Sequence, residues 1–160
     1  MTVTVSPVTE GDIGALVVSV AGLFAEDAGR HDPAMDLGWP EREGAEYYLR
    51  LLGDQACLLL LAHDDGQVPD DQAVGHLVGR LSGPDSLRTQ RVAVLESMRV
   101  APGARRTGVG SLLVRHFFTW ARRGGAQQAS VTAYAANDAA LRFYARHGFS
   151  PTSVTSRAVL

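Results

Sequence analysis

The stretch that decides the fold is residues 98–111, which read Met98-Arg99-Val100-Ala101-Pro102-Gly103-Ala104-Arg105-Arg106-Thr107-Gly108-Val109-Gly110-Ser111. Its first residues end an apolar strand, Pro102 and Gly103 break the chain, and Gly108 and Gly110 open an amphipathic helix that we expect to run to Arg122. Glycine lets a backbone approach a ligand closely, and the first turn of a helix has free N–H donors at a positive dipole end. The pattern predicts an anion site suited to a pyrophosphate, although a tight strand-to-helix turn would use the same residues.

Two other phosphate-binding motifs do not fit this stretch. Leu113 stands where a dinucleotide-binding fingerprint needs its third glycine, and no Gly-Lys-Ser/Thr sequence follows as in a P-loop. Val100-x-Pro102-x-x-Arg105-x-x-Gly108-x-Gly110 instead resembles the acyl-CoA pyrophosphate motif of the GNAT N-acetyltransferase family, with Arg106 where that family often has glycine. The resemblance implies that the pyrophosphate is held by backbone N–H groups of Arg105, Arg106, Thr107, Gly108, Val109, Gly110 and Ser111.

A second segment further along the chain resembles another signature of the same family. It reads Asn137-Asp138-Ala139-Ala140-Leu141-Arg142-Phe143-Tyr144-Ala145-Arg146-His147-Gly148-Phe149. The resemblance extends over residues 92–149, while the N-terminal half agrees with the family in layout only. It implies one domain over residues 1–160 with a mixed, mostly antiparallel α/β sheet. Helices flank this sheet, and splayed central strands form an acyl-CoA cleft.

The resemblance also assigns roles to residues near the thioester. Tyr144 stands where the family places the acid that protonates the CoA sulfur, and a phenol of pKa ~10 can donate to a thiolate whose conjugate acid has a pKa of ~8.5. Outside this motif, a half-buried packing residue would be the ordinary interpretation of such a tyrosine. Asn137 is either a CoA contact or a helix cap.

The strand before the glycine loop is expected to carry the other half of the site. By resemblance, backbone groups of Met98 and Val100 hold the pantetheine arm, and one of their N–H groups polarises the thioester carbonyl. Glu96 lies two residues before Met98, so strand alternation predicts that both side chains share a face. Glu96 is therefore the candidate general base, and a solvated or salt-bridged glutamate is the alternative.

Charge is distributed unevenly along the 160 residues. Residues 1–98 contain 16 acidic and 6 basic residues, whereas residues 99–160 contain 1 acidic residue and 9 arginines. The basic part suits a phosphate-bearing ligand or a nucleic acid, or reflects helix surfaces that carry arginine. No nucleic-acid motif is visible, so we expect no nucleic-acid partner. Residues 26–46 carry a net charge of −5, which would attract a cationic amine or is ordinary solvated loop charge.

Other features of the sequence concern membrane spans, metal ligands, cellular location and local structure. The longest apolar run, Ala56–Ala62, is far shorter than the roughly 20 residues of a membrane-spanning helix, and the N-terminus has no signal-peptide pattern. The histidines and the single Cys57 show no metal-ligand spacing, so we expect no metal and a cytoplasmic protein. The sequence leaves open whether the protein forms a homodimer. Locally, we expect a loop over residues 26–40, a turn running from Asp64 through Asp71, and one or two closing strands over residues 149–160.

Together these features predict an N-acetyltransferase that moves an acetyl group from acetyl-CoA directly to a primary amine in a ternary complex. The expected acceptor is a small cationic metabolite or an aminated antibiotic. Two alternatives stay open: a protein lysine or N-terminal acetyltransferase, and a non-catalytic acyl-CoA-binding sensor domain.

Overall fold

The computed structural model describes residues 1–66 and 72–160, so residues 67–71 of the expected turn lie outside the described residues. Its centre is a five-stranded sheet in which the strands follow chain order. The four N-terminal strands pair antiparallel, and the last pair is parallel. The strands are β1 (Val3–Pro7), β2 (Cys57–Asp64), β3 (Gly75–Ser82), β4 (Val92–Val100) and β5 (Gln128–Val131). The expected mixed, mostly antiparallel sheet is confirmed.

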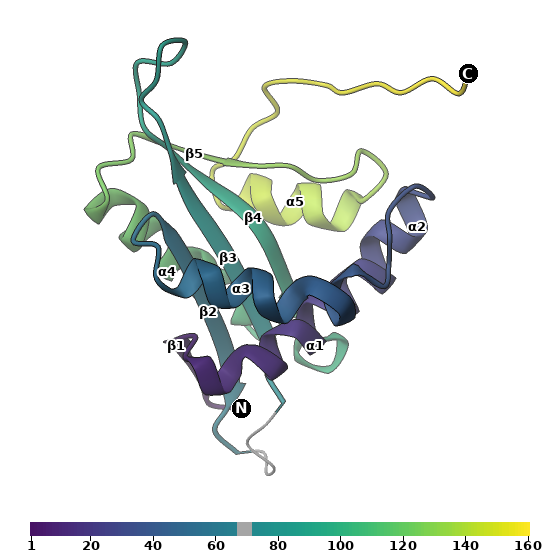
Figure 1. Cartoon of the computed structure of the whole chain (residues 1–160), viewed down its shortest axis with the longest axis vertical. Coiled ribbons are helices and arrows are strands. Elements are labelled where there is room, and N and C mark those ends of the chain that lie inside the picture. Colours follow the sequence, from purple (N-terminus) through teal and green to yellow (C-terminus); the bar gives the residue numbers. More distant parts are fainter. Residues whose placement is uncertain (67–71) are drawn as a thin grey trace.

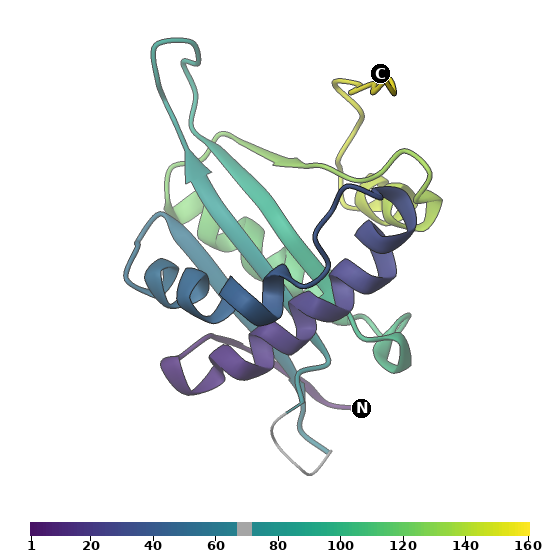
Figure 2. The same ribbon diagram turned by 45° about the vertical axis from the view of Figure 1, so that its right-hand side comes forward.

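Helices cover both faces of this sheet, as Figures 1 and 2 show: α1 and α3 lie on one face and α4 lies on the other. The long helices are α1 (Ile13–Leu23), α3 (Ala45–Leu52), α4 (Val109–Arg123) and α5 (Asp138–Arg146). Shorter helical segments are η1 (Glu10–Asp12), η2 (Phe24–Ala28), α2 (Gly29–His31), η3 (Pro40–Gly44) and η4 (Pro102–Ala104). The predicted helix after the glycine loop is confirmed, and it begins directly after Gly108.

Alternation along the strands divides the core into two layers. On the α4 face, Leu77 and Leu95 pack with Leu113 and Phe117 of α4. On the opposite face, residues such as Val78 pack with α1 and α3, including Leu16, Val20, Tyr48 and Leu51. Because both faces of β2 and β3 are buried, these strands are apolar along most of their length.

Strands β4 and β5 separate after a short parallel contact. Their register joins Val92 to Gln128 and ends where Leu95 meets Val131. Beyond this point the chain after β5 runs away from β4, as both views show (Figures 1 and 2). The residues of β4 from Glu96 to Val100 therefore continue next to β3 alone, which is the splayed arrangement that the family resemblance predicts.

A β-bulge interrupts β4 where the strands diverge. Val78 pairs with Ser97, but Gly79 pairs with Leu95, so Glu96 is the extra residue. As a result, Leu95 and Met98 both pack against the α4-side core, although they are three positions apart. Glu96 contacts Arg80, whose guanidinium reaches Tyr47 of α3 on the other face. The expectation that Glu96 and Met98 share a face is therefore wrong, because the bulge reverses the alternation.

Two local expectations also fail. The loop expected over residues 26–40 is helical at its start, because α1 continues through η2 and α2 to His31. The closing strands expected over residues 149–160 are not present: Phe149 is half-buried, residues 150–160 are exposed, and none of them belongs to a strand. A strand gains stability only from a paired neighbour, and the contact made by this segment is instead an ion pair of Arg157 with Asp32 at 2.9 Å.

Candidate active site

The glycine loop has the backbone conformation that an anion site requires. Gly108 precedes α4 with φ of 93°, and Arg106 is also left-handed with φ of 61°. No side chain caps the N-terminus of α4, so its first-turn N–H groups stay available to a ligand. Thr107 Oγ1 donates to the carbonyl of Ala104 at 2.6 Å, which stabilises the turn before the helix. A Cβ at Gly110 would lie 3.1 Å from the Phe143 ring, so glycine here allows α5 to pack against α4.

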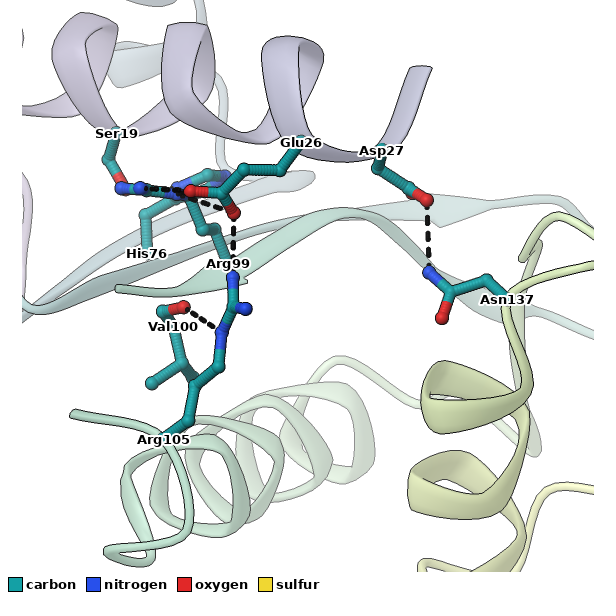
Figure 3. Close-up of polar contacts among 8 residues, drawn as sticks. All are labelled: Ser19, Glu26, Asp27, His76, Arg99, Val100, Arg105 and Asn137. Carbon is teal, nitrogen blue, oxygen red and sulfur yellow. Dashed lines mark hydrogen bonds and ion pairs between the residues drawn. The ribbon is translucent and has the colours of Figure 1, made fainter. Parts of the chain in front are cut away.

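Arg105 lies in the loop but its guanidinium is held by protein groups (Figure 3). Its Nε donates to the carbonyl of Val100 at 3.0 Å, and its Nη2 contacts Glu26 at 2.7 Å. The side chain therefore fixes the loop against the end of β4. Its backbone N–H makes a long hydrogen bond of 3.4 Å to the Pro102 carbonyl, so this N–H of the predicted pyrophosphate cradle is already engaged.

Glu26 connects three parts of the molecule through its two carboxylate oxygens. Arg99 of β4 contacts Oε1 at 2.5 Å, and Arg105 of the loop contacts Oε2. The hydrogen bond from Arg99, followed by the charges of both arginines, lowers the pKa of Glu26 although partial burial opposes the change. Glu26 thus stays ionised and ties η2 to the strand and to the glycine loop.

Asn137 is held at the start of α5 by both ends of its amide. Its Oδ1 accepts a hydrogen bond from the Ala140 N–H at 3.1 Å, which caps the helix. Its Nδ2 donates to Asp27 Oδ1 at 2.9 Å, so the amide also contacts the segment after α1 (Figure 3). The helix-cap interpretation is confirmed, whereas the CoA contact stays a prediction.

Tyr144 lies on α5 in an aromatic environment beside the α4-side core. Its ring makes edge contacts with Phe143 at 5.4 Å and with Phe149 at 5.6 Å between ring centroids. Burial, followed by the negative charge of Asp27, raises the pKa of Tyr144 to about 12. The phenol therefore keeps its proton at physiological pH, and its hydroxyl is a donor.

Glu96 is engaged in an ion pair. Arg80 Nε lies 2.7 Å from Glu96 Oε1, with 36% and 31% of the two side chains exposed. The salt-bridged state that the sequence left open is thus the one observed, and Glu96 reaches an incoming amine only by sharing its carboxylate with Arg80. Met98 and Val100 lie beyond the end of the β5 contact, with their side chains against the α4-side core.

A buried polar chain that the sequence did not reveal joins α1 to β4 through β3 on the α1 face of the sheet. His76 of β3 is fully buried, and its Nδ1 lies 2.7 Å from Ser19 Oγ of α1. Its Nε2 lies 2.7 Å from Ser97 Oγ, directly after the bulge. Burial, followed by the charge of Arg99, lowers the pKa of His76 to about 3. From the sequence, His76 was only a histidine in an apolar strand. Its two hydrogen-bond partners could not be predicted, because they lie 57 and 21 residues away along the chain.

The buried imidazole predicts an acid-sensitive fold. In the unfolded chain His76 takes up a proton below a pKa of 6.5, whereas in the folded protein it does so only near pH 3. The unfolded state therefore binds more protons as the pH falls from 6.5, and stability declines by up to about 1.4 kcal/mol per pH unit. We expect denaturant unfolding to show this slope between pH 6.5 and 5, above the range of most carboxylates.

The test variant is His76→Gln, and its control is His116→Gln. The control replaces a histidine that is exposed on α4, whereas His76 is buried. His76→Gln should be less stable at neutral pH by about 2 kcal/mol, and its stability should be flatter over this pH interval. An unchanged pH slope in His76→Gln would show that other groups cause the acid sensitivity.

The described residues contain neither a candidate metal site nor a candidate membrane-spanning helix. Among the described residues, no group of three or more histidine, cysteine or acidic side chains is arranged to hold a metal ion. In the same part of the chain, no helix has both the length and the apolar character needed to cross a membrane.

Comparison with known proteins agrees with this geometry. The family model described as "Acetyltransferase (GNAT) family" matches residues 26–149. No protein in a curated set is significantly similar to the chain.

Solved structures share the fold at low sequence identity. A transcriptional regulator from Bacillus halodurans C-125 is 23% identical with a TM-score of 0.78, covering 99% of this chain and all of that one. An aminoglycoside 6'-N-acetyltransferase from Acinetobacter baumannii is 20% identical with a TM-score of 0.74, covering 99% and 98%. Glucosamine-6-phosphate N-acetyltransferase from Arabidopsis thaliana is 11% identical with a TM-score of 0.69, covering 99% of each chain.

Proposed function

The chain belongs to the GNAT family of acetyltransferases, and on this basis we propose that it transfers an acetyl group from acetyl-CoA directly to a primary amine of a small cationic acceptor. The observation that carries the proposal is the position of the uncapped, glycine-led N-terminus of α4 beside the diverging part of β4. This arrangement supports a donor whose pyrophosphate binds at the helix and whose pantetheine arm extends along β4.

The donor-side groups belong to four neighbouring elements. The loop from Arg106 to Ser111 offers backbone N–H groups to the pyrophosphate. The N–H of Arg105 is engaged with Pro102, and its side chain is fixed by Val100 and Glu26. Backbone groups of Met98 and Val100 bind the pantetheine arm, and an N–H of this segment stabilises the negative charge that develops on the thioester oxygen. Asn137 donates one hydrogen of its Nδ2 group to Asp27 and contributes the other to binding of acetyl-CoA.

The proposed chemistry forms one bond and breaks one bond. The neutral amine nitrogen attacks the thioester carbon, an amide bond forms, and the carbon–sulfur bond breaks to release CoA. Glu96, directly or through water, accepts the proton that the amine must lose. CoA leaves as the thiolate, to which Tyr144 donates a hydrogen bond. The thiolate then takes a proton from solvent while Glu96 returns the amine proton to solvent, so no net proton is gained or lost.

Charge supports a cationic acceptor. Residues 26–46 carry a net charge of −5, which ion pairs with arginines from outside the segment partly offset. Trp39 of this segment packs against the same core as α3, towards which the ion pair of Arg80 and Glu96 lies. The names of several proteins of similar fold point to amino-sugar acceptors, among them the aminoglycoside acetyltransferase from Acinetobacter baumannii and the glucosamine-6-phosphate enzyme. Both names are consistent with a small acceptor that carries an amino group.

The direct test is release of CoA thiol from acetyl-CoA in the presence of a panel of amines. The panel contains aminoglycosides, polyamines, amino acids and lysine-containing peptides. We expect amine-dependent release with small polycationic acceptors and little release with peptides. Preferential acetylation of peptides would instead identify a protein acetyltransferase. Acetyl-CoA binding by calorimetry without release by any amine would contradict the proposed transfer, and would favour a sensor role.

A further inference from the structure

We propose that Asp27 determines acceptor specificity: its carboxylate binds a second cationic group of the acceptor while another amino group of the same molecule is acetylated. The inference rests on the proposed acetyl transfer and narrows its substrate class to amines with at least two positive charges. Two features of the molecule support it, which are the surroundings of Asp27 and the partners of the neighbouring carboxylates.

Asp27 lies between the end of α1 and the start of α5. It belongs to η2, which continues α1, and its Oδ1 accepts the hydrogen bond from Asn137 Nδ2 across 110 residues of sequence (Figure 3). His31 Nε2 lies 3.7 Å from the same oxygen, and 27% of the Asp27 side chain is exposed. The ring of His31 stacks obliquely with Tyr134, in the segment between β5 and α5, at 5.2 Å between centroids. Asp27 is thus accessible and bordered by aromatic rings.

This environment suits an ammonium group. A carboxylate offers about four acceptor positions, and the hydrogen bond from Asn137 occupies one of them. The electron-rich face of a tyrosine ring such as Tyr134 attracts a cation that lies within about 6 Å. An ammonium group here would therefore gain an ionic contact and an aromatic contact together.

Four of the other six carboxylates of the acidic segment are paired with arginine. Glu26 is held by Arg99 and Arg105, and buried Asp32 is held by Arg157. Asp36 and Glu46 pair with Arg42 and Arg50, respectively. Within residues 26–46, all of which the structure describes, Asp27 differs from these four because the basic side chain beside it is His31 and not an arginine. It differs from the exposed Glu41 and Glu43 of η3 because it also contacts α5 through Asn137. It also lies close enough to the catalytic candidate Tyr144 to affect the pKa of the phenol.

The proximity of Asp27 to Tyr144 links acceptor binding to the departure of the sulfur. The charge of Asp27 is the second cause, after burial, of the raised pKa of Tyr144. A cation bound to Asp27 would offset this charge and strengthen Tyr144 as a hydrogen-bond donor. An acceptor with the second cation would therefore favour both its own binding and the release of the thiol.

The test compares α,ω-diaminoalkanes with monoaminoalkanes of equal chain length. Two measurements are made on wild type, Asp27→Asn, Asn137→Ser and Glu41→Gln: thiol release from acetyl-CoA, and calorimetric binding of each amine to the CoA-bound protein. Glu41 is an exposed carboxylate of η3 and controls for the change in net charge. A serine at position 137 can still cap α5 but removes the amide contact to Asp27.

We expect wild type to prefer the diamine of suitable length, and Asp27→Asn to lose about tenfold in kcat/KM for diamines with no loss for monoamines. Asn137→Ser and Glu41→Gln should keep the diamine preference. The inference is overturned by any of three results. These are no diamine preference in wild type, an equal loss for monoamines in Asp27→Asn, or the same loss of preference in Asn137→Ser.

The two readouts separate this inference from the proposed function. If no amine supports thiol release, the proposed transfer fails. A calorimetric preference for diamines that disappears in Asp27→Asn would still support the binding role of Asp27.

Discussion

Replacing Tyr144 with phenylalanine is expected to slow thiol release about 100-fold to 1,000-fold, which is the usual effect of losing one hydrogen-bond donor aimed at developing charge. The ring contacts with Phe143 and Phe149 do not need the hydroxyl, so the fold and acetyl-CoA binding should be retained. The loss should therefore fall on kcat, and the dissociation constant of acetyl-CoA should not change.

The raised pKa of Tyr144 defines what its hydroxyl can do. A phenol of pKa about 12 does not give its proton completely to a thiolate whose conjugate acid has a pKa of ~8.5. In the proposed reaction Tyr144 therefore acts as a hydrogen-bond donor to the sulfur as charge develops, and its role as the acid that protonates the sulfur stays a prediction.

The matched control is Tyr48→Phe, since Tyr48 is buried in the core between α1, α3 and the sheet. Both variants lose one tyrosine hydroxyl, but only Tyr144→Phe should lower kcat for the best amine of the panel. An unchanged kcat in Tyr144→Phe, with both variants folded by circular dichroism, would remove Tyr144 from the proposed chemistry.

The features that sequence predicted well depend on local residues. Gly108 and Gly110 require a special turn and a close helix contact whatever the rest of the chain does, so the strand-loop-helix unit was predictable. Asn137 followed three residues later by Ala140 forms a helix cap within one turn. These are short-range effects, and a motif of a dozen residues contains all of their causes.

The features that sequence missed depend on contacts between distant residues. The bulge at Glu96 arises from the register between β3 and β4, which alternation along one strand does not report. The helical continuation over η2 is stabilised by contacts of Glu26 with Arg99 and of Asp27 with Asn137, 73 and 110 residues away. For the same reason the neutralised and the accessible carboxylates of the acidic segment were indistinguishable until the fold was known.

Replacing Gly108 with valine is expected to raise the dissociation constant of acetyl-CoA about 100-fold. A Cβ at Gly108 would meet no protein atom within 4 Å, so the effect does not come from a clash within the protein. It comes from the φ of 93° at Gly108, which a β-branched residue strongly disfavours. The backbone before α4 would turn away, and two N–H bonds to the pyrophosphate, each contributing about 1.5 kcal/mol, would be lost.

Two comparisons isolate this effect from a general loss of stability. Gly103 lies in the same loop, is not left-handed, and has no atom within 4 Å of the position that a Cβ would occupy, so Gly103→Val should bind acetyl-CoA normally. S-acetylpantetheine has no pyrophosphate, so Gly108→Val should use it as well as wild type does. If Gly108→Val loses both donors equally, the loop acts on the fold as a whole. A loss confined to acetyl-CoA would place the pyrophosphate at the N-terminus of α4, because the second compound lacks the pyrophosphate and the nucleotide attached to it.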